Sequence, residues 1–167
     1  MSLGLYLHIP YCFSKCRYCD FYSAPGQRGV PRAYVDALLR ELSRFAPDAP
    51  LRPDTLYFGG GTPSLLDPAD AARLIAAAQP LPGAEITLEA NPETVTEDSL
   101  RAFREAGVNR ISFGVQSARD SQLKTLGRPH TAKQARAAFA AARRAGFENI
   151  SGDICLLYTS DAADEED

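Results

Sequence analysis

A strand-and-helix pattern that repeats along the chain constrains the fold more than any other feature of the sequence. The segment 106–112, Ala-Gly-Val-Asn-Arg-Ile-Ser, recurs 39 positions later as 145–151, Ala-Gly-Phe-Glu-Asn-Ile-Ser. Each copy places a glycine where a helix would end, just before a short β-forming run. Repeated units of this kind favour a parallel sheet with helices packed outside it. The sequence therefore predicts an α/β fold.

Five strands and four helices are expected from hydrophobic periodicity and from the residues that interrupt it. Apolar or alternating runs predict strands over residues 3–9, 54–58, 84–90, 110–115 and 149–154. Prolines at first helical positions and capping threonines predict helix starts at Pro31, Pro68, Thr96 and Thr131. The apolar face of the first helix is expected to consist of Val35, Leu38, Leu39, Leu42 and Phe45.

The number of these units is too small for a closed barrel. An eight-unit (β/α) barrel takes about 250 residues, or roughly 31 per unit, so residues 1–154 hold about five units. We therefore expect a partial (β/α) barrel, truncated after about five units, with its last strand as an exposed edge. Residues 155–167 break the pattern, and five of the last eight are acidic. We interpret this tail as non-native or disordered rather than as an acidic interaction segment, and we assign Cys155 no role.

Charge and hydropathy exclude several classes of protein. The formal net charge of −3 implies no basic surface, so no nucleic-acid partner is expected. No apolar run reaches the roughly 18 residues that a membrane-spanning helix needs, so no transmembrane segment is expected. The N-terminus lacks a cationic region before its short apolar run, which argues against a secretory signal. These features predict a cytoplasmic location.

Three of the four cysteines lie within eight positions, directly after the first predicted strand. They are Cys12, Cys16 and Cys19. In a reducing compartment, such clustering favours metal binding or redox chemistry over disulfides. Three thiolates on one loop can hold three irons of a [4Fe-4S] cluster and leave the fourth iron without a protein ligand. The neighbouring Lys15 and Arg17 would favour thiolates and a negatively charged cluster.

Two other interpretations of these cysteines stay open. Their spacing also matches one stripe of a helix, which would make them buried core thiols. They could instead form a Cys3His zinc site with His8 or His130 as the fourth ligand, although zinc ligands usually come as two separated pairs.

Several motifs in order resemble the radical S-adenosylmethionine (SAM) superfamily, and more narrowly its oxygen-independent coproporphyrinogen III oxidase family. The first is Tyr6-x-His8-Ile9-Pro10-Tyr11-Cys12-x3-Cys16-x2-Cys19. The others are Gly59-Gly60-Gly61-Thr62-Pro63-Ser64, Glu89-Ala90-Asn91-Pro92, Gly114-Val115-Gln116-Ser117, Leu126-Gly127-Arg128-Pro129-His130 and Asn149-Ile150-x2-Asp153. The resemblance implies that residues 1–154 are the N-terminal part of a radical SAM core domain, in a partial barrel of radical SAM type.

The resemblance implies two cofactors, a [4Fe-4S] cluster and SAM, and a set of residues for each. The implied cluster ligands are Cys12, Cys16 and Cys19. The implied SAM-binding residues are Tyr6, Tyr18, Gly60, Gly61, Thr62, Glu89, Gln116, Arg128 and Asp153. Most of these residues lie at or after the end of a predicted strand, at the rim where active sites form in parallel α/β proteins. Glu89 interrupts an apolar strand, so its carboxylate needs a partner if it is buried.

One position separates two branches of this family. The oxidase branch typically carries a further cysteine two positions after the third cluster ligand, whereas this chain has Phe21 there. The chain is therefore more similar to the haem-chaperone (HemW) branch, for which the implied partners are haem and a respiratory-enzyme client. The alternative is an enzyme that decarboxylates coproporphyrinogen III oxidatively with SAM. A non-catalytic zinc-binding module is the alternative from another class.

Overall fold

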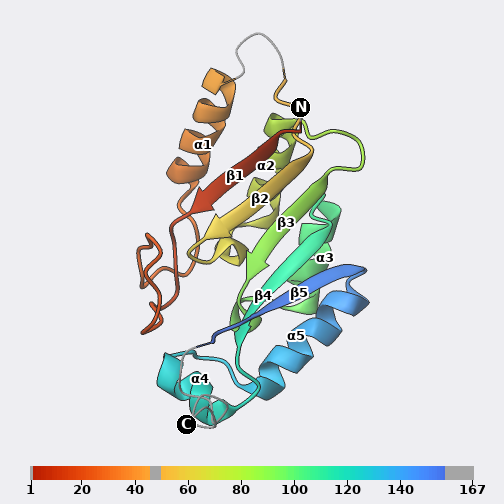
Figure 1. The fold of residues 1–167 in the computed structure, drawn as a ribbon. Coiled ribbons are helices and arrows are strands. Elements are labelled where there is room, and N and C mark those ends of the chain that lie inside the picture. Colours follow the sequence, from red (N-terminus) through yellow and green to blue (C-terminus); the bar gives the residue numbers. More distant parts are fainter. Residues whose placement is uncertain (1, 46–49, 157–167) are drawn as a thin grey trace.

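The computed structural model describes residues 2–45 and 50–156, and its strands form one parallel sheet. The five strands are β1 (Gly4–Ile9), β2 (Thr55–Gly60), β3 (Glu85–Ala90), β4 (Arg110–Gln116) and β5 (Asn149–Ile154). They lie side by side in the order of the chain, and every neighbouring pair is parallel. The predicted α/β fold, with five strands in an open sheet, is confirmed (Figure 1).

The main helices form one layer against the sheet. They are α1 (Arg32–Phe45), α2 (Pro68–Ala78), α3 (Glu97–Glu105) and α5 (Ala132–Arg144). Helix α1 contacts α2, α2 contacts α3, and α3 contacts α5, so the layer follows the order of the strands (Figure 1). A shorter helix, α4 (Asp120–Leu126), and two 3-10 turns, η1 (Pro63–Leu65) and η2 (Pro92–Thr94), lie in the segments that follow strands.

The hydrophobic core lies between the sheet and this helical layer. Ile86 and Leu88 of β3 belong to it, together with buried side chains of all four main helices. Because side chains alternate along a strand, Thr87 and Glu89 face the other side of the sheet. Arg110 on β4 donates a hydrogen bond to the Thr87 hydroxyl at 3.3 Å on that side. The sheet therefore has one apolar face and one polar face, and the polar face is available for a site.

The repeated sequence segment folds in the same way in both copies. After α3, the Gly107 amide donates to the Arg104 carbonyl, and the Val108 amide donates to the Phe103 carbonyl. The equivalent pair of bonds follows α5, and the two glycines have φ angles of 111° and 90°. This Schellman arrangement ends each helix and turns the chain back into the sheet. The predicted role of the repeat as a helix end before a strand is confirmed.

Two details of the elements differ from the sequence prediction. Phe45 is 77% exposed, so its expected place on the buried face of α1 is wrong. It is the last residue of the helix, and no residue after Leu42 is buried within α1. Strand β2 also runs further than residue 58, because Gly59 and Gly60 pair in register with the last two residues of β1.

Helix α4 was not expected from the sequence. It has seven residues, of which Leu123 and Leu126 are buried, so it is too short to show a clear period. Gly127 ends it in the left-handed conformation, with a φ of 74°.

Within the described ranges, no helix has the length and apolar character that crossing a membrane requires. Residues 157–167, which make up most of the predicted tail, lie outside the described residues, so its interpretation stays a prediction.

Candidate functional site

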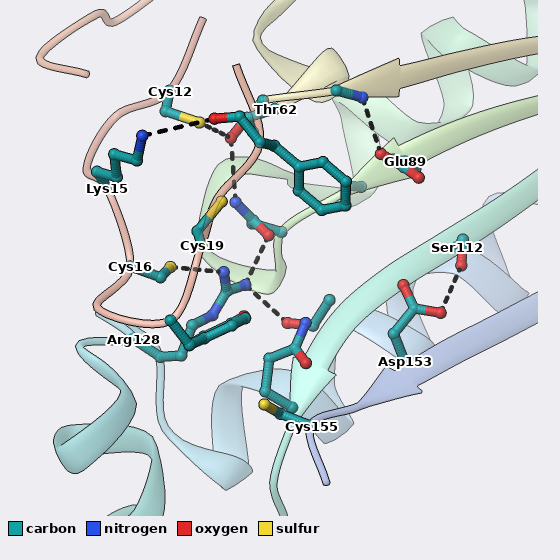
Figure 2. A pocket seen from close by; sticks show the side chains of 18 of the residues that line it. Cys12, Lys15, Cys16, Cys19, Thr62, Glu89, Ser112, Arg128, Asp153 and Cys155 are labelled. Carbon is teal, nitrogen blue, oxygen red and sulfur yellow. Dashed lines mark hydrogen bonds between the residues drawn. The ribbon is translucent and has the colours of Figure 1, made fainter. Parts of the chain in front are cut away.

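The carboxyl ends of the strands and the segments that follow them enclose a cavity of about 470 Å³. All of the residues predicted for the site line it except Tyr6. They are Cys12, Cys16, Tyr18, Cys19, Gly60, Gly61, Thr62, Glu89, Gln116, Arg128 and Asp153. These residues come from the ends of all five strand units, so the predicted meeting of the motifs at one rim is observed (Figure 2).

The three cysteines lie on a loop without helical structure that folds back on itself after β1. The Cys12 amide donates to the Ala24 carbonyl at 3.0 Å, and the Gln27 amide donates to the Cys12 carbonyl at 2.9 Å. The Arg17 amide donates to the Leu126 carbonyl at 3.1 Å, which attaches the loop to the end of α4. The interpretation of the cysteines as one stripe of a core helix is therefore wrong.

Two of the three sulfur atoms accept hydrogen bonds from outside the loop. The Thr62 hydroxyl donates to Sγ of Cys12 at 3.4 Å, and Nη1 of Arg128 donates to Sγ of Cys16 at 3.2 Å. Figure 2 shows the three cysteine side chains on the same side of the cavity, facing Thr62 and Arg128. Burial lowers the pKa of the Arg128 guanidinium, but the hydrogen bond to Cys16 and the charge interactions with Cys16, Glu93 and Tyr18 together outweigh it, so the pKa is raised. Arg128 is therefore a fixed cation beside the thiols.

Neither histidine completes a zinc site with these cysteines. Both ring nitrogens of His8 have partners, the Tyr6 hydroxyl at 3.1 Å and the Tyr22 carbonyl at 3.0 Å. The buried His130 lies between the Glu93 carboxylate and a backbone carbonyl of β4, each at 3.0 Å. Among the described residues, no three His, Cys, Asp or Glu side chains converge on one ion position. In a [4Fe-4S] cluster each thiolate binds its own iron, so the three sulfurs need not converge.

The glycines after β2 let the cysteine loop approach the sheet closely. The Gly61 amide donates to the Ile9 carbonyl at 2.8 Å. A Cβ atom on Gly61 would lie 2.9 Å from Sγ of Cys12 and 2.7 Å from the Tyr11 carbonyl oxygen, which is too close for any side chain. Gly60 has a φ of 118°, a conformation that residues with a side chain rarely adopt. Gly61 therefore needs glycine for space, and Gly60 needs it for conformation.

Glu89 faces the cavity with both carboxylate oxygens hydrogen-bonded. The Tyr57 hydroxyl donates to Oε1 at 2.8 Å, and the Gly60 amide donates to Oε2 at 3.2 Å. Burial raises the pKa of Glu89 above its usual value; the nearby Asp153 also raises it, while these two hydrogen bonds oppose the shift. The predicted need of this carboxylate for partners is met by Tyr57 and Gly60.

The raised pKa of Glu89 predicts a pH dependence of folding stability. The unfolded chain releases this proton near pH 4.5, while the folded protein holds it to a higher pH. The free energy of unfolding therefore falls as pH rises from 4.5 through the folded-state pKa. A Glu89→Gln variant cannot ionise there, so we expect it to lose less stability over the same range. Urea unfolding of both proteins at a series of pH values measures this, and identical pH profiles would contradict it.

Gln116 ends β4 with a backbone conformation that the sequence does not reveal. Its φ is 67°, in the left-handed region that residues other than glycine seldom occupy. The pairing with β5 shifts register between Gly114 and Gln116, and the Cys155 amide donates to the Gln116 carbonyl at 3.0 Å. This irregularity places Gln116 in the cavity wall rather than in a regular strand.

Other predicted positions differ in their surroundings. Burial raises the pKa of the Tyr18 phenol above its usual range. Asp153 on β5 accepts a hydrogen bond from the Ser112 hydroxyl at 3.4 Å. Tyr6 does not line the cavity: it is 54% exposed and stacks on Tyr57 at a ring-centroid distance of 6.0 Å. A direct contact of Tyr6 with a cofactor therefore stays a prediction.

Sequence reasoning assigned no role to several residues that line this cavity, among them Asn91, Gly114 and Cys155. Asn91 and Gly114 lie inside motifs quoted for the resemblance, and Cys155 follows β5. Asn91 accepts a hydrogen bond from Nη2 of Arg128 at 2.6 Å, and the Gly114 carbonyl accepts another from the same atom at 2.7 Å. The Glu-Ala-Asn-Pro motif could have drawn attention to Asn91, but the partners of Asn91, Thr62 and Arg128, are distant in sequence and could not be inferred from it.

Two known proteins are similar in sequence to this chain over most of its length. The chain is 44% identical over 158 residues to the haem chaperone HemW of Escherichia coli, covering 91% of this chain and 42% of the relative. It is 40% identical over 163 residues to the mitochondrial radical S-adenosyl methionine domain-containing protein 1 of Bos taurus, covering 92% of this chain and 36% of the relative. The chain thus spans less than half the length of these relatives.

A solved structure supports the same relationship. Coproporphyrinogen III oxidase (HemN) from Escherichia coli, described as a radical SAM enzyme, superimposes with a TM-score of 0.81 at 31% identity. The match covers 92% of this chain and 37% of that protein. The radical SAM superfamily itself matches residues 6–167. With its parallel sheet and its cysteine loop at the rim, the chain belongs to the radical SAM superfamily.

Proposed function

We propose that the cavity binds a [4Fe-4S] cluster and SAM, and that the protein is a haem chaperone of the HemW type. The observation that carries the cofactor part is the lining of one cavity by all three thiols of the cysteine loop. Cysteine thiolates are the usual ligands of iron–sulfur clusters, so the donor set fits. Cys12, Cys16 and Cys19 would each hold one iron. The absence of a side chain at Gly61 supports this assignment, because a Cβ there would collide with Cys12.

The rest of the rim supports SAM as the second ligand. Glu89 and Asp153 offer carboxylate oxygens that accept hydrogen bonds from hydroxyl groups, and Tyr57 and Gly60 fix the orientation of Glu89. Arg128 offers a guanidinium for a carboxylate, and its Nε is buried without a hydrogen-bond partner among the described residues. When bound together, the cluster and SAM supply one-electron cleavage of SAM to methionine and a 5′-deoxyadenosyl radical.

The assignment to haem delivery depends on similarity and on one residue position. The bacterial relatives named haem chaperone HemW share about 40% identity with this chain over most of its length, for example 44% with that of Escherichia coli. Phe21 is 68% exposed and lines the cavity at the position where the oxidase branch typically has a cysteine. Haem, a respiratory-enzyme client and a cytoplasmic location are parts of this proposal.

The test is anaerobic reconstitution of the protein expressed from its complete gene, followed by three measurements. We expect four irons and four sulfides per chain, binding of added haem seen by absorption, and no decarboxylation of coproporphyrinogen III. The Escherichia coli coproporphyrinogen III oxidase is the positive control for the last assay. Turnover of coproporphyrinogen would overturn the chaperone assignment in favour of the oxidase. Bound zinc without iron–sulfur absorption would overturn both and support the zinc module.

A further inference from the structure

We propose that Asn91 is a positioning residue that orients hydrogen-bond donors onto two of the three cluster ligands and thereby raises the reduction potential of the cluster. This inference rests on the proposed function of the cysteine loop as the cluster site. Asn91 lies between β3 and η2, at the rim of the cavity. Its side-chain hydrogen bonds among the described residues are with Thr62 and Arg128 rather than with Cys12 or Cys16, so its effect would pass through those two residues.

A continuous chain of hydrogen bonds joins Sγ of Cys12 to Sγ of Cys16 through Asn91. Nη1 of Arg128 reaches Cys16 at 3.2 Å, and Nη2 of Arg128 reaches Oδ1 of Asn91 at 2.6 Å. Nδ2 of Asn91 reaches Oγ1 of Thr62 at 3.2 Å, and that oxygen reaches Cys12 at 3.4 Å. The dashed lines that run between Arg128 and Thr62 in Figure 2 trace this path. Asn91 is its central member.

The chemistry of the donors allows only one direction of donation along this series of hydrogen bonds. Arginine can only donate, so the side-chain oxygen of Asn91 must face Arg128, and its NH2 group must face Thr62. The Thr62 hydroxyl accepts that hydrogen bond and keeps its single proton for Cys12. Both sulfur atoms are therefore acceptors. An amide is the group that can serve both neighbours in this way, since a carboxylate has no proton to give to Thr62.

The surrounding structure holds Asn91 in this position. The Asn91 carbonyl accepts hydrogen bonds from the Thr94 amide at 3.0 Å and from the Thr94 hydroxyl at 2.9 Å. A Cβ atom on Gly114 would lie 3.0 Å from Oδ1 of Asn91 and 3.1 Å from Nη2 of Arg128, so glycine leaves the space that this contact needs. The buried contact of His130 with Glu93 joins the segment after Arg128 to η2. Asn91 and Arg128 are thus fixed relative to each other from both sides.

Hydrogen bonds to thiolate ligands are among the factors that set the potential of an iron–sulfur cluster. A donor withdraws charge from the sulfur and stabilises the reduced, more negative state. Removing the Asn91 amide would leave the Gly114 carbonyl as the one remaining partner of Nη2 of Arg128 among the described residues, and it would free the Thr62 hydroxyl to turn away from Cys12. We therefore expect a more negative potential and weaker retention of iron. Residues that contact the ligands typically contribute 10–100-fold to metal affinity, and Asn91 acts through two such residues, so we expect iron to be lost to a chelator up to about tenfold faster.

The experiment compares Asn91→Leu and Asn91→Asp with the wild-type protein after anaerobic reconstitution, by redox titration followed by electron paramagnetic resonance. Both variants should hold a cluster with a more negative potential. In Asn91→Asp, the carboxylate accepts the only proton of Thr62 and leaves Cys12 without its donor. The control is Asn109→Leu: the Asn109 amide also makes two hydrogen bonds, to Ala84 and Ile86 at the opposite end of β3. That variant should lose stability and keep the wild-type potential.

A second background separates positioning from general weakening. Thr62→Val removes the donor to Cys12 with little change of shape, so it should shift the potential in the same direction. The further shift caused by Asn91→Leu should be smaller in the Thr62→Val protein than in the wild type. An unchanged potential in both Asn91 variants, or fully additive shifts with Thr62→Val, would overturn the inference. Failure of the wild-type protein to hold a cluster would instead overturn the proposed function.

Discussion

Replacing Cys16 with alanine is expected to abolish retention of the [4Fe-4S] cluster. The loop offers three thiols to the cavity, and loss of one would leave a second iron with no protein ligand while the Arg128 guanidinium faces an apolar methyl group. Losing a ligand costs more than losing a partner of a ligand, for which 10–100-fold in affinity is typical. Iron and sulfide per chain after gel filtration, together with the absorption and paramagnetic spectra, measure the effect.

Cys155 provides the matched control for this prediction. It also lines the cavity, and the same cysteine-to-alanine change there removes a thiol to which no ligand role is assigned. The Cys155→Ala protein should retain the wild-type iron content and spectrum. If Cys16→Ala keeps four irons, or if Cys155→Ala loses them, the assignment of the ligands to the cysteine loop is wrong.

Replacing Phe103 with alanine is expected to have the largest effect on folding stability among single changes in the helical layer. Phe103 of α3 is 1% exposed and belongs to the core between the sheet and the helices. Truncation of a fully buried phenylalanine costs about 3–5 kcal/mol, because apolar contact is lost and a cavity remains. Since whole domains are stable by about 5–15 kcal/mol, much of the stability would be lost. Urea unfolding monitored by circular dichroism measures this.

Phe45 offers the same chemical change without the burial. It also lies in a helix, but it is 77% exposed, so Phe45→Ala should alter the free energy of unfolding by no more than about 0.5 kcal/mol. A cost for Phe45→Ala as large as that of Phe103→Ala would mean that the end of α1 is covered by a partner. Equal, small costs at both positions would contradict the core described for α3.

The site and the core occupy opposite faces of one sheet, and alternation along the strands produces both. On β3, Leu88 points into the core while Glu89 points to the cavity, next to Tyr57 of the neighbouring strand. A substitution on the core side should therefore act first on stability, and one on the polar side first on cofactor binding. Glu89 belongs to both groups, since its pKa shift links the cavity to the stability of the fold.

Much of the fold was predictable from the sequence because its signals are local. The strand ranges depend on runs of apolar side chains, and the helix starts depend on capping residues within one turn. Thr96 and Thr131 form capping boxes as predicted for helix starts. The glycines of the repeated segment end two helices with the same pair of backbone hydrogen bonds. Helix α4 was missed because two apolar residues in seven positions define no period.

The order of the strands also follows from local information, since short turns keep consecutive parallel units adjacent. The parallel direction of the strands predicts that the motifs after each strand share one rim. The residue types in the cysteine loop then indicate thiolate chemistry, and the resemblance to radical SAM proteins identifies the cofactors that would use it. The sequence by itself thus determined the class of fold and the rim at which the predicted site residues meet, whereas their roles in binding a cofactor stay a prediction.

Only the tertiary structure decided how those residues contact one another. Arg128 donates to Cys16 across 112 positions of the chain, and Thr62 donates to Cys12 across 50. The left-handed backbone of Gln116 and the central place of Asn91 between Thr62 and Arg128 were likewise invisible in the sequence. Periodicity and capping act within a few residues, whereas these contacts depend on the packing of separate strand ends, so their partners become known only when the chain is folded.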